Sequence, residues 1–121
     1  MSASILLQID DPGDRIIRAP FCLIRGWCAC GDRSAFGSVQ FRIGRGQLRW
    51  KPEQRPDVTE AHPDKASVGF RIDFDLKEHL YAVEGGIVTI TLMLNGIREM
   101  QLEFSVLNGV IGNCLAAAAG V

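Results

Sequence analysis

The chain has 121 residues, of which 47% are hydrophobic and 22% charged, and its 13 basic and 14 acidic side chains leave a net charge of −1. A chain of this length forms one domain, so we take residues 1–121 as a single folded unit. The composition excludes intrinsic disorder, which needs low hydrophobicity and high net charge. The charge also argues against a nucleic-acid partner, because phosphate binding needs a clustered basic excess.

The N-terminal residues carry neither a basic region nor a long apolar run, so the sequence predicts no signal peptide. No stretch reaches the ~18 apolar residues that a membrane span needs. We therefore expect a cytoplasmic protein with reduced thiols at its 4 cysteines.

Apolar and polar residues alternate with a period of two along most of the chain, which is typical of strands with one buried face. Strands are expected near residues 5–9, 16–19, 21–30, 39–43, 70–76, 88–94 and 100–106, with a break at Pro20. In the third of these, the odd-numbered face, which carries Trp27, is expected to be the core face. Asn95-Gly96 predicts a tight type I′ hairpin between the last two strands, because both turn positions need a positive φ.

Residues 51–67 are predicted to be a long, proline-rich connection. Asp57, followed by Glu60 three positions later, fits a capping box for one helical turn, which Pro63 would end. Residues 107–121 form a C-terminal tail without charged side chains. An apolar tail exposed to water would promote aggregation, so we expect it to add a strand, to fold as a short helix or to be buried in a partner subunit.

About seven strands separated by turn signals predict an all-β fold, an immunoglobulin-like or fibronectin-like antiparallel β-sandwich. A closed barrel is the alternative. We expect one sandwich domain over residues 1–121, with 107–121 as its apolar tail.

Several short motifs resemble a recurring bacterial domain. In chain order they are Gly26-Trp27, Val39-Gln40-Phe41-Arg42-Ile43, Arg55-Pro56-Asp57-Val58, His62-Pro63 and Gly69-Phe70. This pattern is similar to that of small β-sandwich accessory domains attached to glycosyltransferases and methyltransferases of surface-polysaccharide pathways. The resemblance covers roughly residues 5–106, and the RPDV-to-GF stretch is its most specific part. It implies a non-catalytic module and a glycan, glycosyltransferase or methyltransferase partner.

The candidate ligand-binding residues cluster around the 50–69 region. Arg55, Asp57 and His62 lie in one proline-stiffened loop, and binding residues often sit on loops held by a rigid scaffold. Trp50 lies at the mouth of that loop, where an aromatic ring could stack on a sugar. Each residue also has a structural interpretation, in which Asp57 caps a helical turn, Arg55 pairs with a carboxylate and Trp50 covers the edge of the core.

The other candidate chemistries are weaker. Asp73 and Asp75 share one strand face, but an exposed sheet face lacks the cleft and the raised pKa that a glycosidase acid needs. Cys22, Cys28 and Cys30 have the same parity and could form a soft-metal or redox site, although free cysteines more often act as small hydrophobic residues. We therefore predict no catalytic residues, no metal and no cofactor.

The sequence thus favours a non-catalytic binding or accessory module, carbohydrate-related and associated with polysaccharide biosynthesis. The first alternative is a structural module for protein docking or for homo-oligomerisation through residues 107–121. The second is a metal or redox protein that uses its cysteines.

Overall fold

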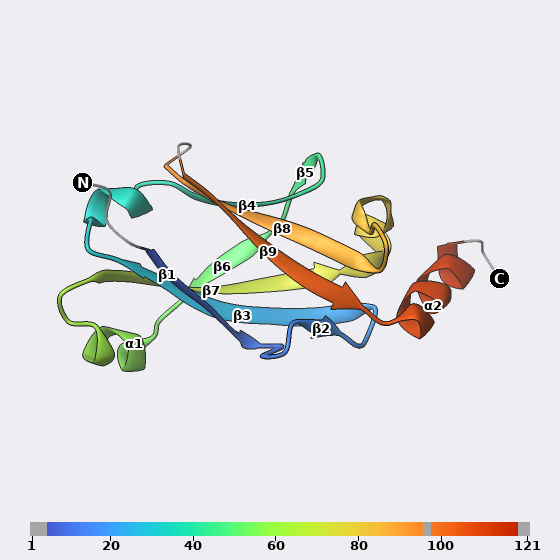
Figure 1. The fold of residues 1–121 in the computed structure, drawn as a ribbon, viewed down its shortest axis with the longest axis horizontal. Helices are drawn as coiled ribbons and strands as arrows, with labels where there is room; N and C mark the ends of the chain where they lie inside the picture. Colours follow the sequence, from blue (N-terminus) through green and yellow to red (C-terminus); the bar gives the residue numbers. More distant parts are fainter. Residues whose placement is uncertain (1–4, 96–97, 119–121) are drawn as a thin grey trace.

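The computed structural model describes residues 5–95 and 98–118 (Figure 1). Its strands are β1 (Ile5–Asp11), β2 (Ile16–Ile17), β3 (Phe21–Cys30), β4 (Val39–Ile43), β5 (Gly46–Gln47), β6 (Trp50–Glu53), β7 (Ala66–Asp75), β8 (Ile87–Leu94) and β9 (Arg98–Val106). Its helices are η1 (Arg33–Phe36), α1 (Pro56–Ala61), η2 (Leu76–Ala82) and α2 (Asn108–Ala118), of which η1 and η2 are 3₁₀ segments.

The strands form two sheets, a 4-stranded sheet in the order β1-β3-β7-β6 and a 5-stranded sheet in the order β2-β9-β8-β4-β5. Neighbouring strands are antiparallel except β2 and β9, which are parallel. The two sheets face each other across one hydrophobic core (Figure 1). The predicted all-β sandwich is confirmed, whereas its immunoglobulin-like or fibronectin-like character stays a prediction.

The core follows the period-two pattern in four of the strands. Fully buried side chains project inward from β4, β7, β8 and β9, and the largest are Phe41, Phe70, Phe74 and Phe104. These are the faces that the sequence predicts for those strands.

The predicted core face of β3 is wrong. Ile24, Cys28 and Cys30 are fully buried, whereas Trp27 is half-buried on the opposite side. The register explains this, because Ile24 lies opposite the buried Ile72 and Arg25 opposite the exposed Arg71. The two cysteines therefore occupy core positions, and Trp27 lies on the outer face of the 4-stranded sheet.

The 50–69 region also differs from the prediction. Its first residues form β6, an edge strand that accommodates Pro52 because a proline on an edge need not donate to a neighbour. The helical turn is present and ends before Pro63, but Arg55 is its N-cap residue and Pro56 begins it. The predicted capping box is thus wrong, because Asp57 lies inside the helix and its carboxylate binds Arg55.

The hairpin between β8 and β9 is confirmed, but its connection is longer than predicted. Leu94 pairs with Arg98, so three positions join the strands instead of two. Asn95 has a φ of +56°, as a turn of this kind needs. Gly96 lies outside the described residues.

The tail forms α2 at one end of the sandwich (Figure 1). Val110 and Cys114 belong to the buried core, whereas Leu107 and Leu115 are exposed. Of the three predicted fates of the tail, the short helix is the one observed for the described residues. Within the described part of the chain, no helix is long and apolar enough to cross a membrane.

Candidate ligand-binding site

A hollow opens at the edge of the 4-stranded sheet where β6 ends. β6 pairs with β7 only as far as Glu53 opposite Gly69, where the chain leaves the sheet to form α1. β7 begins three residues before Gly69, at Ala66, so its residues 66–68 have no neighbouring strand on this side. The resulting hollow has a volume of about 860 Å³. It is lined by Pro52, Glu53, Gln54, Arg55, Pro56, Thr59, Glu60, Ser67, Val68 and Gly69.

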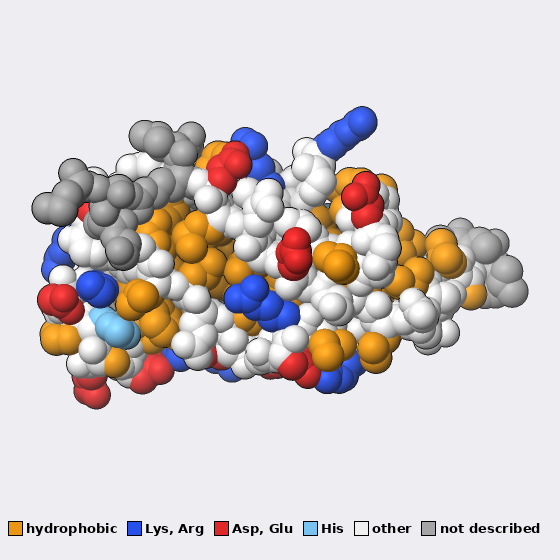
Figure 2. All heavy atoms as spheres, in the orientation of Figure 1, with side chains coloured by type: hydrophobic (Ala, Val, Ile, Leu, Met, Phe, Trp, Pro, Cys, Tyr) orange, Lys and Arg blue, Asp and Glu red, His pale blue; other side chains and the backbone are white. Residues whose placement is uncertain are grey.

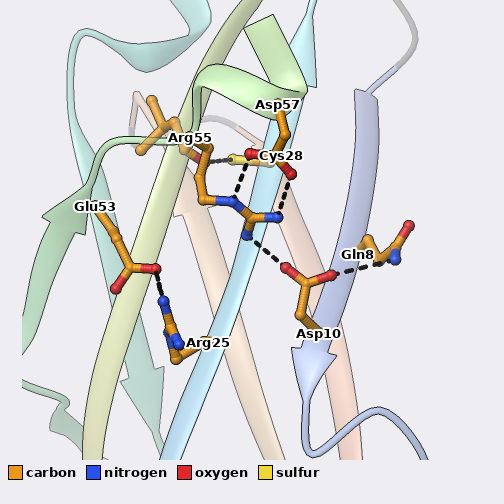
Figure 3. Close-up of polar contacts among 8 residues, drawn as sticks. Gln8, Asp10, Arg25, Cys28, Glu53, Arg55 and Asp57 are labelled. Carbon is orange, nitrogen blue, oxygen red and sulfur yellow. Dashed lines mark hydrogen bonds and ion pairs between the residues drawn. The ribbon is translucent and has the colours of Figure 1, made fainter. Parts of the chain in front are cut away.

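Arg55 is the central residue of the polar network beside this hollow (Figure 3). Its Nε and Nη2 donate to the two carboxylate oxygens of Asp57, at 3.0 and 2.8 Å. Its Nη1 reaches across the sheet to Oδ2 of Asp10 on β1. Gln8 then donates to the other oxygen of Asp10, at 3.3 Å. Arg55 therefore ties the loop before α1 to the strand at the far edge of the sheet.

A second pair lies next to this network. Nη2 of Arg25 donates to Oε1 of Glu53 at 2.6 Å, which fixes the last residue of β6 to the outer face of β3. Two arginines and two aspartates surround a smaller hollow of about 250 Å³ between these pairs, and its lining is Asp10, Asp11, Arg25 and Arg55.

Arg55 and Asp57 each favour the ionised form of the other. Hydrogen bonds from Arg55 are the main cause that lowers the pKa of Asp57 below its usual value, and the bond to Asp57 likewise raises the pKa of Arg55. The side chain of Arg55 is only 18% exposed, so both of its charge-assisted contacts are partly shielded from water. Three of the five guanidinium N–H groups of Arg55 are used in these bonds, which leaves two for a ligand.

Gly69 makes the course of Arg55 possible. A β-carbon at this position would lie 2.3 Å from the carbonyl oxygen of Glu53 and 2.5 Å from Cγ of Arg55. No side chain fits there, so the Arg55 stem passes directly over the backbone of β7. The glycine of the Gly69-Phe70 motif and the arginine of the Arg55-Pro56-Asp57-Val58 motif are thus one packing unit.

The two aromatic candidates lie in different places. Trp50 is half-buried and packs edge-on against Phe41, with the ring centroids 5.4 Å apart. His62 is the C-terminal cap of α1 and packs at a tilt against Trp27, with the ring centroids 5.6 Å apart. Trp50 thus lies on the core side of the sheet, and His62 on its outer side. Neither residue lines the hollow.

The three candidate thiols also fail to form a cluster that could hold a metal. Among the described residues, no group of three or more His, Cys, Asp or Glu side chains has that arrangement. Burial is the main cause that raises the pKa of Cys28 to about 12, with a smaller contribution from Cys30. Because the thiolate is the form that binds metals and attacks disulfides, this environment disfavours both chemistries at Cys28.

Of the four predicted site residues, the structure brings Arg55 and Asp57 together and leaves Trp50 and His62 apart from them. Asp10, Arg25 and Glu53 also belong to the network, and none of them was predicted from the sequence as a site residue. Glu53 could have been found from the strand alternation of β6, had that strand been recognised. Asp10 and Arg55 are 45 positions apart, and no local signal connects them.

Comparison with protein-family models, with curated proteins and with solved structures finds no match for this chain.

Proposed function

We propose that this chain is a non-catalytic binding module that recognises a carbohydrate in the hollow beside β6, and that it serves polysaccharide biosynthesis as an accessory module. The observation that carries the proposal is the hollow itself, since its volume lies in the range of about 300–1,000 Å³ that ligand pockets occupy. It coincides with the 50–69 region that holds the most specific motifs.

The lining suits a sugar. Gln54, Thr59 and Ser67 supply an amide and two hydroxyl groups, and Glu60 adds a carboxylate. Sugar hydroxyls both donate and accept hydrogen bonds, so side chains of these kinds can bind them from several sides. The unpaired edge of β7 offers main-chain groups in addition, because alternate residues of a strand direct their N–H and C=O towards each neighbour.

The carboxylates of the network favour binding over catalysis. Asp10 and Asp57 are bound by Arg55, and Glu53 is bound by Arg25. A general acid needs a raised pKa, whereas the pKa of Asp57 is lowered. Three carboxylates are thus already used to hold the site in shape.

The strand order supports the immunoglobulin-like form of the sandwich. Immunoglobulin domains place strands A-B-E-D in one sheet and C-F-G in the other. The order β1-β3-β7-β6 and the neighbours β9-β8-β4 follow the same arrangement when taken in chain order.

A thermal-shift titration against mono- and oligosaccharides tests the proposal. A ligand at ~10 times its Kd stabilises the fold by about 1.4 kcal/mol, which raises Tm by several degrees in a domain of this size. Glu60→Trp, which blocks the hollow from the surface of α1, should abolish the shift. Ala61→Trp, on the same helix but outside the lining, should retain it. A flat panel, or equal shifts in both variants, would contradict the proposal.

A docking or homo-oligomerisation module is the second candidate. One observation favours it: hydrophobic side chains gather on the surface around α2 (Figure 2). Leu115 of α2 and Leu107, which directly precedes the helix, are both exposed. If this surface assembles copies of the chain, the wild type should be larger than a monomer in light scattering, and Leu115→Gln should reduce its mass. A monomeric wild type at high concentration would exclude the homo-oligomer.

A further inference from the structure

Three cations form one row across the outer face of the 4-stranded sheet. The register places Arg25 of β3 opposite Arg71 of β7, and Arg71 opposite Lys51 of β6. Directly opposed residues of antiparallel strands project to the same side, with their Cα atoms about 4.5–5.5 Å apart. All three side chains are exposed, because the residues beside them in sequence, such as Ile24 and Ile72, point into the core.

The row is only partly neutralised. Arg25 is bound to Glu53. Nε of Arg71 is 3.7 Å from Oδ1 of Asp73, which is too long for a hydrogen bond. Lys51 has no ion pair in the part of the chain that the structure describes. Among the described residues, Lys51 thus lacks a carboxylate partner, and Arg71 has only the loose ion pair with Asp73.

Such a row costs stability, because like charges directly opposite each other on a sheet repel. A lysine on an edge strand is often a device against edge-to-edge pairing, and this accounts for Lys51. It does not account for Arg71, whose strand lies between β3 and β6. An anion shared by Arg71 and Lys51 would relieve the repulsion and use both charges.

We propose that the carbohydrate of the proposed function is acidic, and that its carboxylate groups bind across Arg71 and Lys51. This inference rests on the proposed function, since it names the class of sugar. The row and the hollow are close: Glu53 follows Lys51 by two residues on β6, and Gly69 precedes Arg71 by two on β7. Two residues of a strand span about 7 Å, so one oligosaccharide can reach both.

Calorimetric titration of trigalacturonate, an acidic trisaccharide, tests the inference against the neutral maltotriose and against sulfate at matched ionic strength. Wild-type protein should bind trigalacturonate, with an affinity that falls as salt rises. Arg71→Gln and Lys51→Gln should each weaken it about tenfold, which corresponds to removing one charge-assisted contact of roughly 1.4 kcal/mol. Arg42→Gln removes the same charge from an exposed position on the other sheet and should leave binding unchanged.

The thermal stability of the unliganded variants provides a second readout. Loss of a residue with only a structural role should lower Tm, whereas Arg71→Gln should leave Tm equal or raise it while binding is lost. Equal affinities of Arg71→Gln and Arg42→Gln would overturn the inference. The inference would also be overturned if sulfate bound as tightly as trigalacturonate and lost affinity in the same variants, because this would indicate an adventitious ion only.

The two proposals fail in different ways. If maltotriose binds as well as trigalacturonate and Glu60→Trp blocks both, the carbohydrate-binding function stands and the acidic preference is wrong. If neither the trisaccharides nor the wider panel binds, both proposals are wrong.

Discussion

The stem of Arg55 lies over the bare backbone of Gly69, so close that a β-carbon on Gly69 would be 2.5 Å from Cγ of Arg55. The same β-carbon would be 2.3 Å from the carbonyl oxygen of Glu53. Arg55 therefore crosses the sheet to Asp10 only because β7 carries no side chain at this point.

Gly69→Ala should lower the free energy of unfolding by about 1–3 kcal/mol, since the methyl group overpacks the site and one of the clashing atoms belongs to the backbone. Urea denaturation measures the change. Gly31→Ala is the control, because a β-carbon at Gly31 has no neighbour within 4 Å. If both alanine variants are equally stable, Arg55 and the end of β6 move aside freely.

The pair between Arg55 and Asp10 should stabilise the fold measurably. A double-mutant cycle of Arg55→Gln and Asp10→Asn should give a coupling free energy of about 1 kcal/mol, the upper part of the range for ion pairs that water still reaches. The more exposed pair of Arg18 and Asp14 serves as the comparison and should show a smaller coupling. Equal coupling in the two cycles would mean that the partial burial of Arg55 has no energetic effect.

The lowered pKa of Asp57 predicts a pH dependence. A carboxyl group whose pKa is lower in the folded state than in the unfolded state stabilises the fold above its unfolded value, here near 3.8. This stabilisation is lost as the pH falls from that value through the lower folded pKa. Asp57→Asn should therefore lower Tm at pH 7 and have little effect near pH 2. A Tm difference that is constant over this range would exclude the ionised Asp57–Arg55 pair as its cause.

The cysteines should differ in reactivity. Cys28, Cys30 and Cys114 are fully buried, whereas Cys22 is half-buried. Burial raises the pKa of both Cys22 and Cys28, the latter to about 12. Iodoacetamide at pH 8 should therefore modify Cys22 first and slowly, and all 4 cysteines after denaturation, as peptide mass spectrometry can show. Rapid modification of Cys28 in the native protein would mean that β3 opens readily.

The end of the sandwich should depend on α2. Val110→Ala removes two methyl groups from a buried position and should cost about 1–2 kcal/mol of unfolding free energy. Leu115 lies on the same helix and is 56% exposed, so Leu115→Ala should change the free energy of unfolding little. If Val110→Ala has no effect, α2 does not contribute to the core.

The strands whose apolar rows are unambiguous were predicted from the sequence, and the predictions failed where pairing with distant strands decides the structure. On β3 both faces are apolar enough to be buried, and the choice between them was decided by pairing with β7, whose residues are 36 or more positions away. On β6, Pro52 concealed a strand that tolerates proline only because it is an edge strand. Neither fact is visible within a short window of sequence.

The length of the connection between β8 and β9 could have been predicted from the sequence. The inward residues of β8 and β9 are all even-numbered, from Val88 to Leu94 and from Met100 to Val106. If two antiparallel strands both direct even-numbered residues to the core, an odd number of residues must connect them. A two-residue turn at Asn95-Gly96 would have placed Glu99 in the core row. Parity alone predicts the longer connection.

The candidate site was predictable only as a region. The motifs identified Arg55 and Asp57, and the structure shows these two in contact. The hollow results from a difference in length between β6 and β7, which depends on where the chain leaves the sheet. The partners of Arg55 and Arg25 follow from register and could not be inferred without it.

The parallel pairing of β2 with β9 has a mechanical consequence. The amide of Ser105 donates to the carbonyl of Arg15, and that of Leu107 to the carbonyl of Ile17. β1 begins in the half of the molecule that carries α1, and α2 lies at the opposite end of the long axis (Figure 1). Tension applied between these ends would slide β2 along β9, so that these hydrogen bonds bear the load together instead of opening one after another. This short strand would therefore resist pulling more strongly than its length suggests.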